Sequence, residues 1–170
     1  DRERVARRLA DPDAAPVHLL VNNAGFSLHE AVTEAAPGDL ERQLDVNVKN
    51  VVFGTQAAAR RMKARGSGHI VNIGSLSGTR PSPGSAAYGA AKAGLANLTR
   101  TLAIEWAPKV RLNLVTGGYI LTEQADLHYG DDAGVARVAA TVPMGRLASP
   151  TDVGNACVFL APPLPRHITG

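Results

Sequence analysis

Three short runs of mostly apolar residues recur along the chain, and small or polar residues follow each of them. They cover residues 17–21, 69–73 and 110–115. A short run in which successive residues are mostly apolar, without apolar/polar alternation, is typical of a parallel strand buried on both faces. The pattern therefore predicts three parallel strands.

The segments between these runs carry apolar residues at spacings of three and four, which predicts helices. One helix should run from Asp39 to the glycines at 66–68, and another should end near Pro108. A short helix is expected over residues 1–10, and Ser149-Pro150 begins one that reaches Leu160. The residues that carry the spacing are Val5, Leu9, Leu40, Leu44, Val48, Val51, Val52, Thr55, Ala59, Met62, Ala91, Leu95, Leu98, Leu102 and Trp106.

Strands that alternate with helices indicate a doubly wound α/β fold with right-handed crossovers. The 170 residues contain no repeat and no linker, so we expect a single domain over 1–170. Residues 117–148 show little periodicity and are expected to form a flexible substrate lid.

Composition excludes several classes of protein. The net charge of +3 comes from basic residues at helix ends without interleaved aromatics, so we expect no nucleic-acid partner. The single cysteine, Cys157, lies in an apolar stretch and indicates a reducing compartment. No run approaches the roughly 18 apolar residues of a membrane span, and no secretory leader precedes the first strand. We expect a cytoplasmic protein with no membrane partner.

Polar and small residues gather where the three strands end, at residues 22–25, 74–75 and 116–122. In a doubly wound sheet, ligands bind beyond the carboxyl ends of the strands. Tyr88 and Lys92 lie four residues apart at the start of a helix, so both side chains share one face. A nearby ammonium favours the ionised phenol, which would let Tyr88 act as general acid or base, and the Ser75 hydroxyl suits holding a carbonyl oxygen.

The order of these motifs resembles the short-chain dehydrogenase/reductase family, and 3-oxoacyl-acyl-carrier-protein reductases within it. The matching motifs are Asn22-Asn23-Ala24-Gly25, Asp45-Val46-Asn47-Val48, Asn72-Ile73-Gly74-Ser75 and Tyr88-Gly89-Ala90-Ala91-Lys92. Asn47 follows Asn23 by 24 residues, Ser75 follows Asn47 by 28, and Tyr88 follows Ser75 by 13. These intervals are typical of the family. The resemblance implies a Rossmann-like sheet of which about three of seven strands are present here.

The resemblance also implies a catalytic set of Asn47, Ser75, Tyr88 and Lys92. Tyr88 would be the acid/base, Lys92 would lower its pKa and hold the nicotinamide ribose, and Ser75 would orient the substrate. Asn47 would kink its helix and anchor a proton-relay water, while Asn22 and its neighbours would stabilise the central strands.

By the same resemblance, Tyr88 and Lys92 also bind the cofactor, together with residues that follow two of the strands. These residues are Asn23, Ala24, Gly25, Gly118, Ile120 and Thr122. Ile120 would pack near the nicotinamide carboxamide and Thr122 would bind the cofactor by a hydrogen bond. After the strand at 110–115 the family usually has Asn-x-x-x-Pro-Gly-x-x-x-Thr. This chain keeps that pattern over residues 113–122, except that Gly117 stands in place of the proline.

The implied activity is NAD- or NADP-dependent hydride transfer between a nicotinamide and a carbonyl or alcohol, without a metal. The family's glycine-rich turn, which binds the pyrophosphate, has no counterpart in these residues, so NAD and NADP both remain open. Acyl thioesters, steroids, sugars and small alcohols remain open as substrates. A dimer or tetramer is expected, with Val51, Ala57, Ala58 and Leu98 at its faces. The alternative is a catalytically silent remnant that acts as a structural or oligomerising module.

Overall fold

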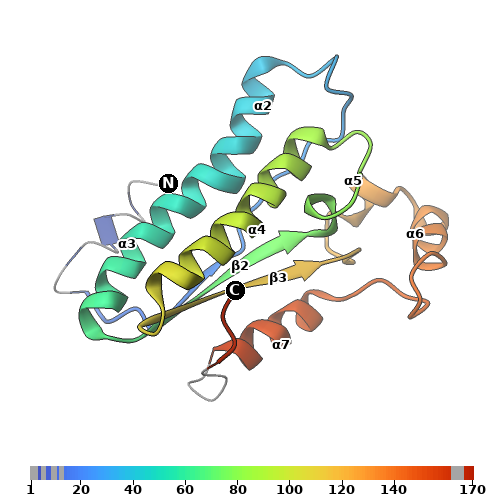
Figure 1. Ribbon diagram of the computed structural model, residues 1–170. Helices are drawn as coiled ribbons and strands as arrows, with labels where there is room; N and C mark the ends of the chain where they lie inside the picture. Colours follow the sequence, from blue (N-terminus) through green and yellow to red (C-terminus); the bar gives the residue numbers. More distant parts are fainter. Residues whose placement is uncertain (1–3, 5–6, 9–10, 12–13, 162–166) are drawn as a thin grey trace.

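A parallel three-stranded sheet forms the centre of the molecule in the computed structural model, which describes residues 4, 7–8, 11, 14–161 and 167–170. The strands are β1 (Leu19–Asn22), β2 (Gly68–Ser75) and β3 (Val110–Gly117), in the order β1-β2-β3 (Figure 1). Asn22 pairs with Asn72 in the register of the ladder. All three predicted strands are confirmed.

Helices cover both faces of this sheet, as the doubly wound prediction requires (Figure 1). On one face lie α3 (Asn50–Arg65) and α4 (Ala86–Trp106), and α7 (Pro150–Leu160) packs on the other. The capping box at the start of α7 is formed, because Ser149 and Asp152 each accept a hydrogen bond from the other's backbone N–H. The fold class is therefore confirmed.

Two apolar clusters hold the helices to the sheet. The cluster beneath α3 and α4 consists of Ala58, Ala59, Met62, Ile70, Ala103, Val110 and Leu112. The cluster beneath α7 consists of Val71, Ile73 and Leu160. Val51 is 5% exposed and Ala58 is fully buried, so the expectation that these two side chains face a second subunit was wrong. They pack inside this chain instead.

The helix predicted from Asp39 is interrupted. It comprises α2 (Pro37–Leu44), a π-helical turn at Asp45–Lys49 and then α3. Asn47 lies within this turn, so the expected departure from regular helix at that residue is confirmed.

Buried polar side chains tie β1 and β2 to the two helices above them. The Asn22 amide donates to Thr55 Oγ1 at 3.0 Å and to Asn72 Oδ1 at 2.8 Å. The Asn72 amide in turn donates to Thr99 Oγ1 at 2.9 Å. This network fixes the central strands, as expected for Asn22.

Residues 117–148 contain two short helices, α5 (Ala125–Tyr129) and α6 (Asp132–Ala139). Asp131 begins α6 by accepting a hydrogen bond from the Gly134 N–H at 3.0 Å. A bridge between Ile120 and Ala148 joins the two ends of the segment. The segment is thus more ordered in its local structure than its sequence pattern indicated.

Two further expectations concern the chain ends and membranes. Val5 and Leu9, which carried the expectation of a helix over 1–10, lie outside the described residues. Among the helices that the structure describes, none has the length and apolar character needed to cross a bilayer.

Candidate active site

The expected site forms at the carboxyl end of β2. The strand ends at Ser75, and a short 3-10 turn (Leu76–Gly78) leads into the loop before α4. Ser75 Oγ accepts a hydrogen bond from the Ser77 N–H at 3.2 Å, which fixes the start of the turn. Tyr88 lies in the first turn of α4, so strand end and helix start meet here.

Lys92 is a buried lysine, with only 4% of its surface exposed. Its Nζ donates to the Ile73 carbonyl oxygen at 2.8 Å and lies 5.5 Å from the centre of the Tyr88 ring. Burial lowers the pKa of Lys92 below 10.5, because the charged form is less well solvated. The ammonium is therefore held beside the phenol by one strong backbone contact, with further N–H groups to offer.

The pKa of Tyr88 moves in the direction opposite to the expectation. Burial raises it above 10.0, and hydrogen bonding with Ser75 opposes the rise. We expected Lys92 to lower this pKa, but Lys92 donates to the Ile73 carbonyl, and burial dominates. That expectation was wrong for this arrangement, in which Tyr88 keeps its proton at neutral pH.

Asn47 clamps the loop that follows β1. Its amide donates to the Phe26 carbonyl at 2.6 Å and to the Gln43 carbonyl at 2.8 Å, and its Oδ1 accepts from the Phe26 N–H at 3.2 Å. Asn47 is fully buried. Through these contacts Asn47 positions the loop after β1. Its expected role in holding a relay water remains an expectation.

The loop held by Asn47 fits close approach by a ligand. Asn23, Ala24 and Gly25 are exposed at the end of β1. A Cβ on Gly25 would lie 3.2 Å from Asn47 Oδ1 and 3.6 Å from Lys92 Nζ. The missing side chain thus keeps the space beside Lys92 Nζ free, and the residues expected to hold a nicotinamide ribose fit that task.

The other expected cofactor residues follow β3. Gly118 and Thr122 are exposed, and Thr122 Oγ1 accepts from the Gln124 N–H at 3.4 Å. A Cβ on Gly117 would lie 3.0 Å from Ile120 Cδ1, so the absence of a side chain there makes room for Ile120. The structure therefore gives a local reason for the departure from proline at position 117.

A cavity of about 640 Å³ opens beside Ser75 and Tyr88. Residues that the sequence did not single out as site residues also line it, among them His29, Arg80 and Tyr119. The Arg80 guanidinium donates to the Tyr119 hydroxyl at 3.0 Å. Arg80 lies in a proline- and glycine-rich loop without periodicity, and its one sequence signal was proximity to Ser75.

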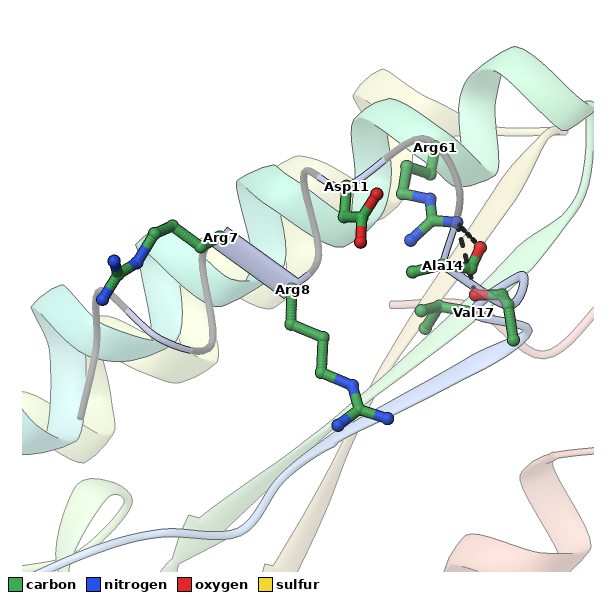
Figure 2. A pocket seen from close by; sticks show the side chains of 7 residues that line it. Arg7, Arg8, Asp11, Ala14, Val17 and Arg61 are labelled. Atoms are coloured by element: carbon green, nitrogen blue, oxygen red, sulfur yellow. Dashed lines mark hydrogen bonds between the residues drawn. The ribbon is translucent and has the colours of Figure 1, made fainter.

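A second hollow, of about 680 Å³, lies at the amino end of β1 (Figure 2). Arg7, Arg8 and Arg61 line it, and Arg61 donates to the Ala14 carbonyl oxygen at 2.6 Å. None of its lining residues belongs to the expected site, which is at the opposite edge of the sheet. The cavity beside Tyr88 is therefore the candidate active site.

Comparison with known proteins agrees with this geometry. The model of a family described as enoyl-(acyl carrier protein) reductase matches residues 3–170. Galactitol 2-dehydrogenase (L-tagatose-forming) of Cereibacter sphaeroides is 38% identical over the whole chain, and nodulation protein G of Azospirillum brasilense is 34% identical over 94% of it. These matches span 68% and 65% of the two relatives.

Solved structures share the fold. A gluconate 5-dehydrogenase from Burkholderia cenocepacia, in complex with NADP and tartrate, superimposes with a TM-score of 0.92 at 28% identity. A short chain dehydrogenase/reductase family protein superimposes with a TM-score of 0.88 at 37% identity. Each match covers 99% of this chain and 68% of the other. The chain thus spans about two thirds of the length of the proteins it matches.

Proposed function

Because the chain belongs to the short-chain dehydrogenase/reductase family, we propose that it is the catalytic portion of an NAD- or NADP-dependent oxidoreductase acting on an alcohol or carbonyl. The observation that carries the proposal is that Ser75 and Tyr88 line one cavity while Lys92 is buried against the Tyr88 ring. The relatives are longer than this chain, which matches 68% and 65% of two of them. The activity of the whole protein is therefore part of the proposal.

Tyr88 is the proton donor in the direction of carbonyl reduction. Its raised pKa keeps the phenol protonated at neutral pH, so a proton is available for the carbonyl oxygen as that oxygen gains negative charge. Ser75 has a rotatable hydroxyl that donates to the same oxygen, which both orients the substrate and stabilises the developing charge. In the reverse direction Tyr88 takes the proton back from the alcohol.

Lys92 binds and positions the cofactor and takes no part in the hydride transfer itself. One N–H of its ammonium is used by the Ile73 carbonyl, and Nζ lies 5.5 Å from the centre of the Tyr88 ring and 3.6 Å from where a Cβ on Gly25 would stand. We assign the cofactor ribose to Lys92 and the loop of Asn23, Ala24 and Gly25. Gly118, Ile120 and Thr122 are assigned to the nicotinamide end. The cofactor supplies the hydride when bound.

The segment over 117–148 shapes the substrate side of the site and acts as its lid. Tyr119, Leu127, His128, Tyr129 and Val138 come from this segment and line the cavity. Their side chains exclude water from the reacting oxygen when the segment closes, which strengthens the hydrogen bonds of Ser75 and Tyr88.

The proposal also covers the cellular location and the oligomeric state of the protein. We place it in the cytoplasm, and we propose a dimer or tetramer, supported by the large apolar side chains that α4 and α7 leave exposed. Ile104 is 83%, Val158 70% and Phe159 63% exposed. Sedimentation velocity at several concentrations tests the oligomer, and a species of monomer mass throughout would contradict it.

Cofactor binding tests the proposal most simply. Isothermal titration of NADH and of NADPH into the purified protein should give one site per chain, and Lys92→Met should weaken that site at least about tenfold because the ribose loses charge-assisted hydrogen bonds. Exposed Lys63→Met is the matched control. Failure of both cofactors to bind would favour the alternative of a non-catalytic structural module.

A further inference from the structure

The wall of the active-site cavity has a chemical character that the proposed reaction alone does not require. Seventeen residues line it, of which five are serines, three are tyrosines and two are histidines. Arg80 is the one lysine, arginine, aspartate or glutamate among them. A cavity that served a small apolar ketone would be lined mainly by apolar side chains.

Part of this polarity is used within the protein. Ser85 Oγ lies 2.8 Å from Ser82 Oγ, and Ser77 Oγ donates to Ser82 Oγ at 3.3 Å, so these three serines stiffen the loop. In the described part of the chain the side chains of Ser27 and His29 make no such hydrogen bond, so both remain able to bind a ligand. Tyr119 and Tyr129 present hydroxyls from the lid segment, with their rings packed edge to face at 6.0 Å.

Arg80 carries a positive charge that no acidic residue of the described structure neutralises. Lys49 pairs with Asp45 and Arg146 pairs with Asp152, so neither of these ion pairs involves Arg80. Glu30, on a neighbouring segment, lines a separate hollow.

Arg80 is an exposed residue, and its guanidinium contacts Tyr119. The central carbon of the guanidinium lies 5.6 Å from the centre of the Tyr119 ring, and one nitrogen donates to its hydroxyl at 3.0 Å. A guanidinium that is hydrogen-bonded through one nitrogen keeps its other N–H donors for a ligand, and these match a carboxylate in two parallel hydrogen bonds.

We propose that Arg80 selects a substrate that carries a carboxylate as well as several hydroxyl groups, such as the aldonic-acid class of sugar acids. This inference rests on the proposed oxidoreductase function and names the substrate class of the same site. One arginine balances one negative charge, which favours a carboxylate over a phosphate dianion. Ser75 and Tyr88 bind the reacting oxygen, and Arg80 binds the carboxylate elsewhere in the same cavity.

The test compares six-carbon substrates that differ at one end: a hexitol, the corresponding aldonate, its methyl ester and the hexitol phosphate. With the preferred nicotinamide cofactor, kcat/KM should be highest for the aldonate. Arg80→Gln should lower kcat/KM for the aldonate about 10- to 100-fold, mainly through KM, and change that for the hexitol by less than about threefold. Arg80→Lys should recover part of the loss, because the charge returns without the planar fork.

The control variant is Arg100→Gln, which removes an exposed arginine of α4 outside the cavity and should leave the aldonate preference intact. Equal kcat/KM for aldonate and methyl ester, or a preference for the phosphate, would overturn the assignment of a carboxylate. Equal losses on every substrate in Arg80→Gln would show a role in folding rather than selection.

A binding measurement separates this inference from the proposed function. Calorimetric titration of the aldonate into the protein, without turnover, should give a site that Arg80→Gln weakens by the same factor. Binding of this kind without hydride transfer on any substrate would contradict the oxidoreductase proposal and support the carboxylate site. Turnover of alcohols with no aldonate binding would do the reverse.

Discussion

Burial acts on the charged forms of Tyr88 and Lys92 alike. It raises the pKa of the phenol and lowers the pKa of the ammonium, because both charged forms lose solvation. At the start of α4, Lys92 Nζ lies 5.5 Å from the centre of the Tyr88 ring. A protonated tyrosine beside a lysine that is costly to bury is a poor arrangement for stability and a useful one for proton transfer.

The cost of burying Lys92 gives a test that separates function from folding. Lys92→Met removes a charge that the fold disfavours and loses one hydrogen bond to the Ile73 carbonyl. We expect the free energy of unfolding to stay within about 1 kcal/mol of the wild type or to increase, while turnover falls at least about 100-fold. Urea unfolding and steady-state kinetics measure the two effects. A loss of several kcal/mol would show that Lys92 is mainly structural.

The protonation of Tyr88 can be measured directly in the cofactor-free protein. Because its pKa is raised above 10.0, the phenol is still mostly protonated at pH 10.0. The midpoint of the difference in tyrosinate absorbance between the wild type and Tyr88→Phe should therefore lie above pH 10.0. A difference signal centred near pH 8 would mean that the Lys92 ammonium outweighs burial.

At the scale of elements, the site depends on where helices break rather than on where they run. The π-helical turn between α2 and α3 directs Asn47 to the loop after β1, and two hydrogen bonds join Asn47 to Phe26 in that loop. The loop in turn brings Gly25 close to Lys92 Nζ. An uninterrupted helix would aim the side chain at position 47 differently.

Asn47→Ala tests this connection. The change leaves the Phe26 backbone N–H and carbonyl without their partner, which should destabilise the protein by about 2 kcal/mol. It should weaken cofactor binding more than the matched change Asn50→Ala, at an exposed position that begins α3. Thermal unfolding and cofactor titration give the two numbers. Normal cofactor affinity in Asn47→Ala would show that the clamp does not position the loop.

The pairing of β2 and β3 contains a buried histidine that predicts acid sensitivity. Burial, and then the charge of Arg111, lowers the pKa of His69 from 6.5 to about 4. His69 lies in hydrogen-bond contact with Asn113, 3.0 Å between nitrogens, and is 2% exposed. Since the unfolded chain binds this proton more tightly, stability is complete above about pH 6.5 and is lost as the pH falls toward 4.

The loss should be on the order of 2 kcal/mol. His69→Gln should flatten the pH dependence of the unfolding midpoint between pH 4 and 6.5, whereas His18→Gln, at an exposed position, should not. An unchanged slope in His69→Gln would assign the acid sensitivity to other groups.

Local sequence signals sufficed for the strands, the long helices and the Tyr88–Lys92 pair, since each depends on periodicity or spacing within one element. The direction of the Tyr88 pKa did not follow from spacing, because burial arises from packing between elements distant in sequence. Arg80 was missed because loops lack periodicity, and α5 and α6 were missed because helices this short are stabilised by caps and neighbours rather than by a repeating pattern.

At the scale of the molecule, helices on both faces leave the carboxyl edge of the sheet open for the site. Ser75, Tyr88 and the cavity come from one strand end, one helix start and the segment over 117–148. Each lies in a different part of the sequence, and the parallel sheet brings them together. The hollow near Arg61 lies at the opposite edge and shares no residue with this arrangement.

In the proposed reaction, Tyr88 delivers the proton during hydride transfer. Turnover of Tyr88→Phe, followed by the absorbance of the reduced nicotinamide with saturating substrate, tests it most directly. We expect kcat to fall about 100- to 10,000-fold while cofactor affinity stays within about threefold of the wild type, because phenylalanine keeps the ring and loses only the hydroxyl that carries the transferable proton. Turnover within about tenfold of the wild type would contradict the account.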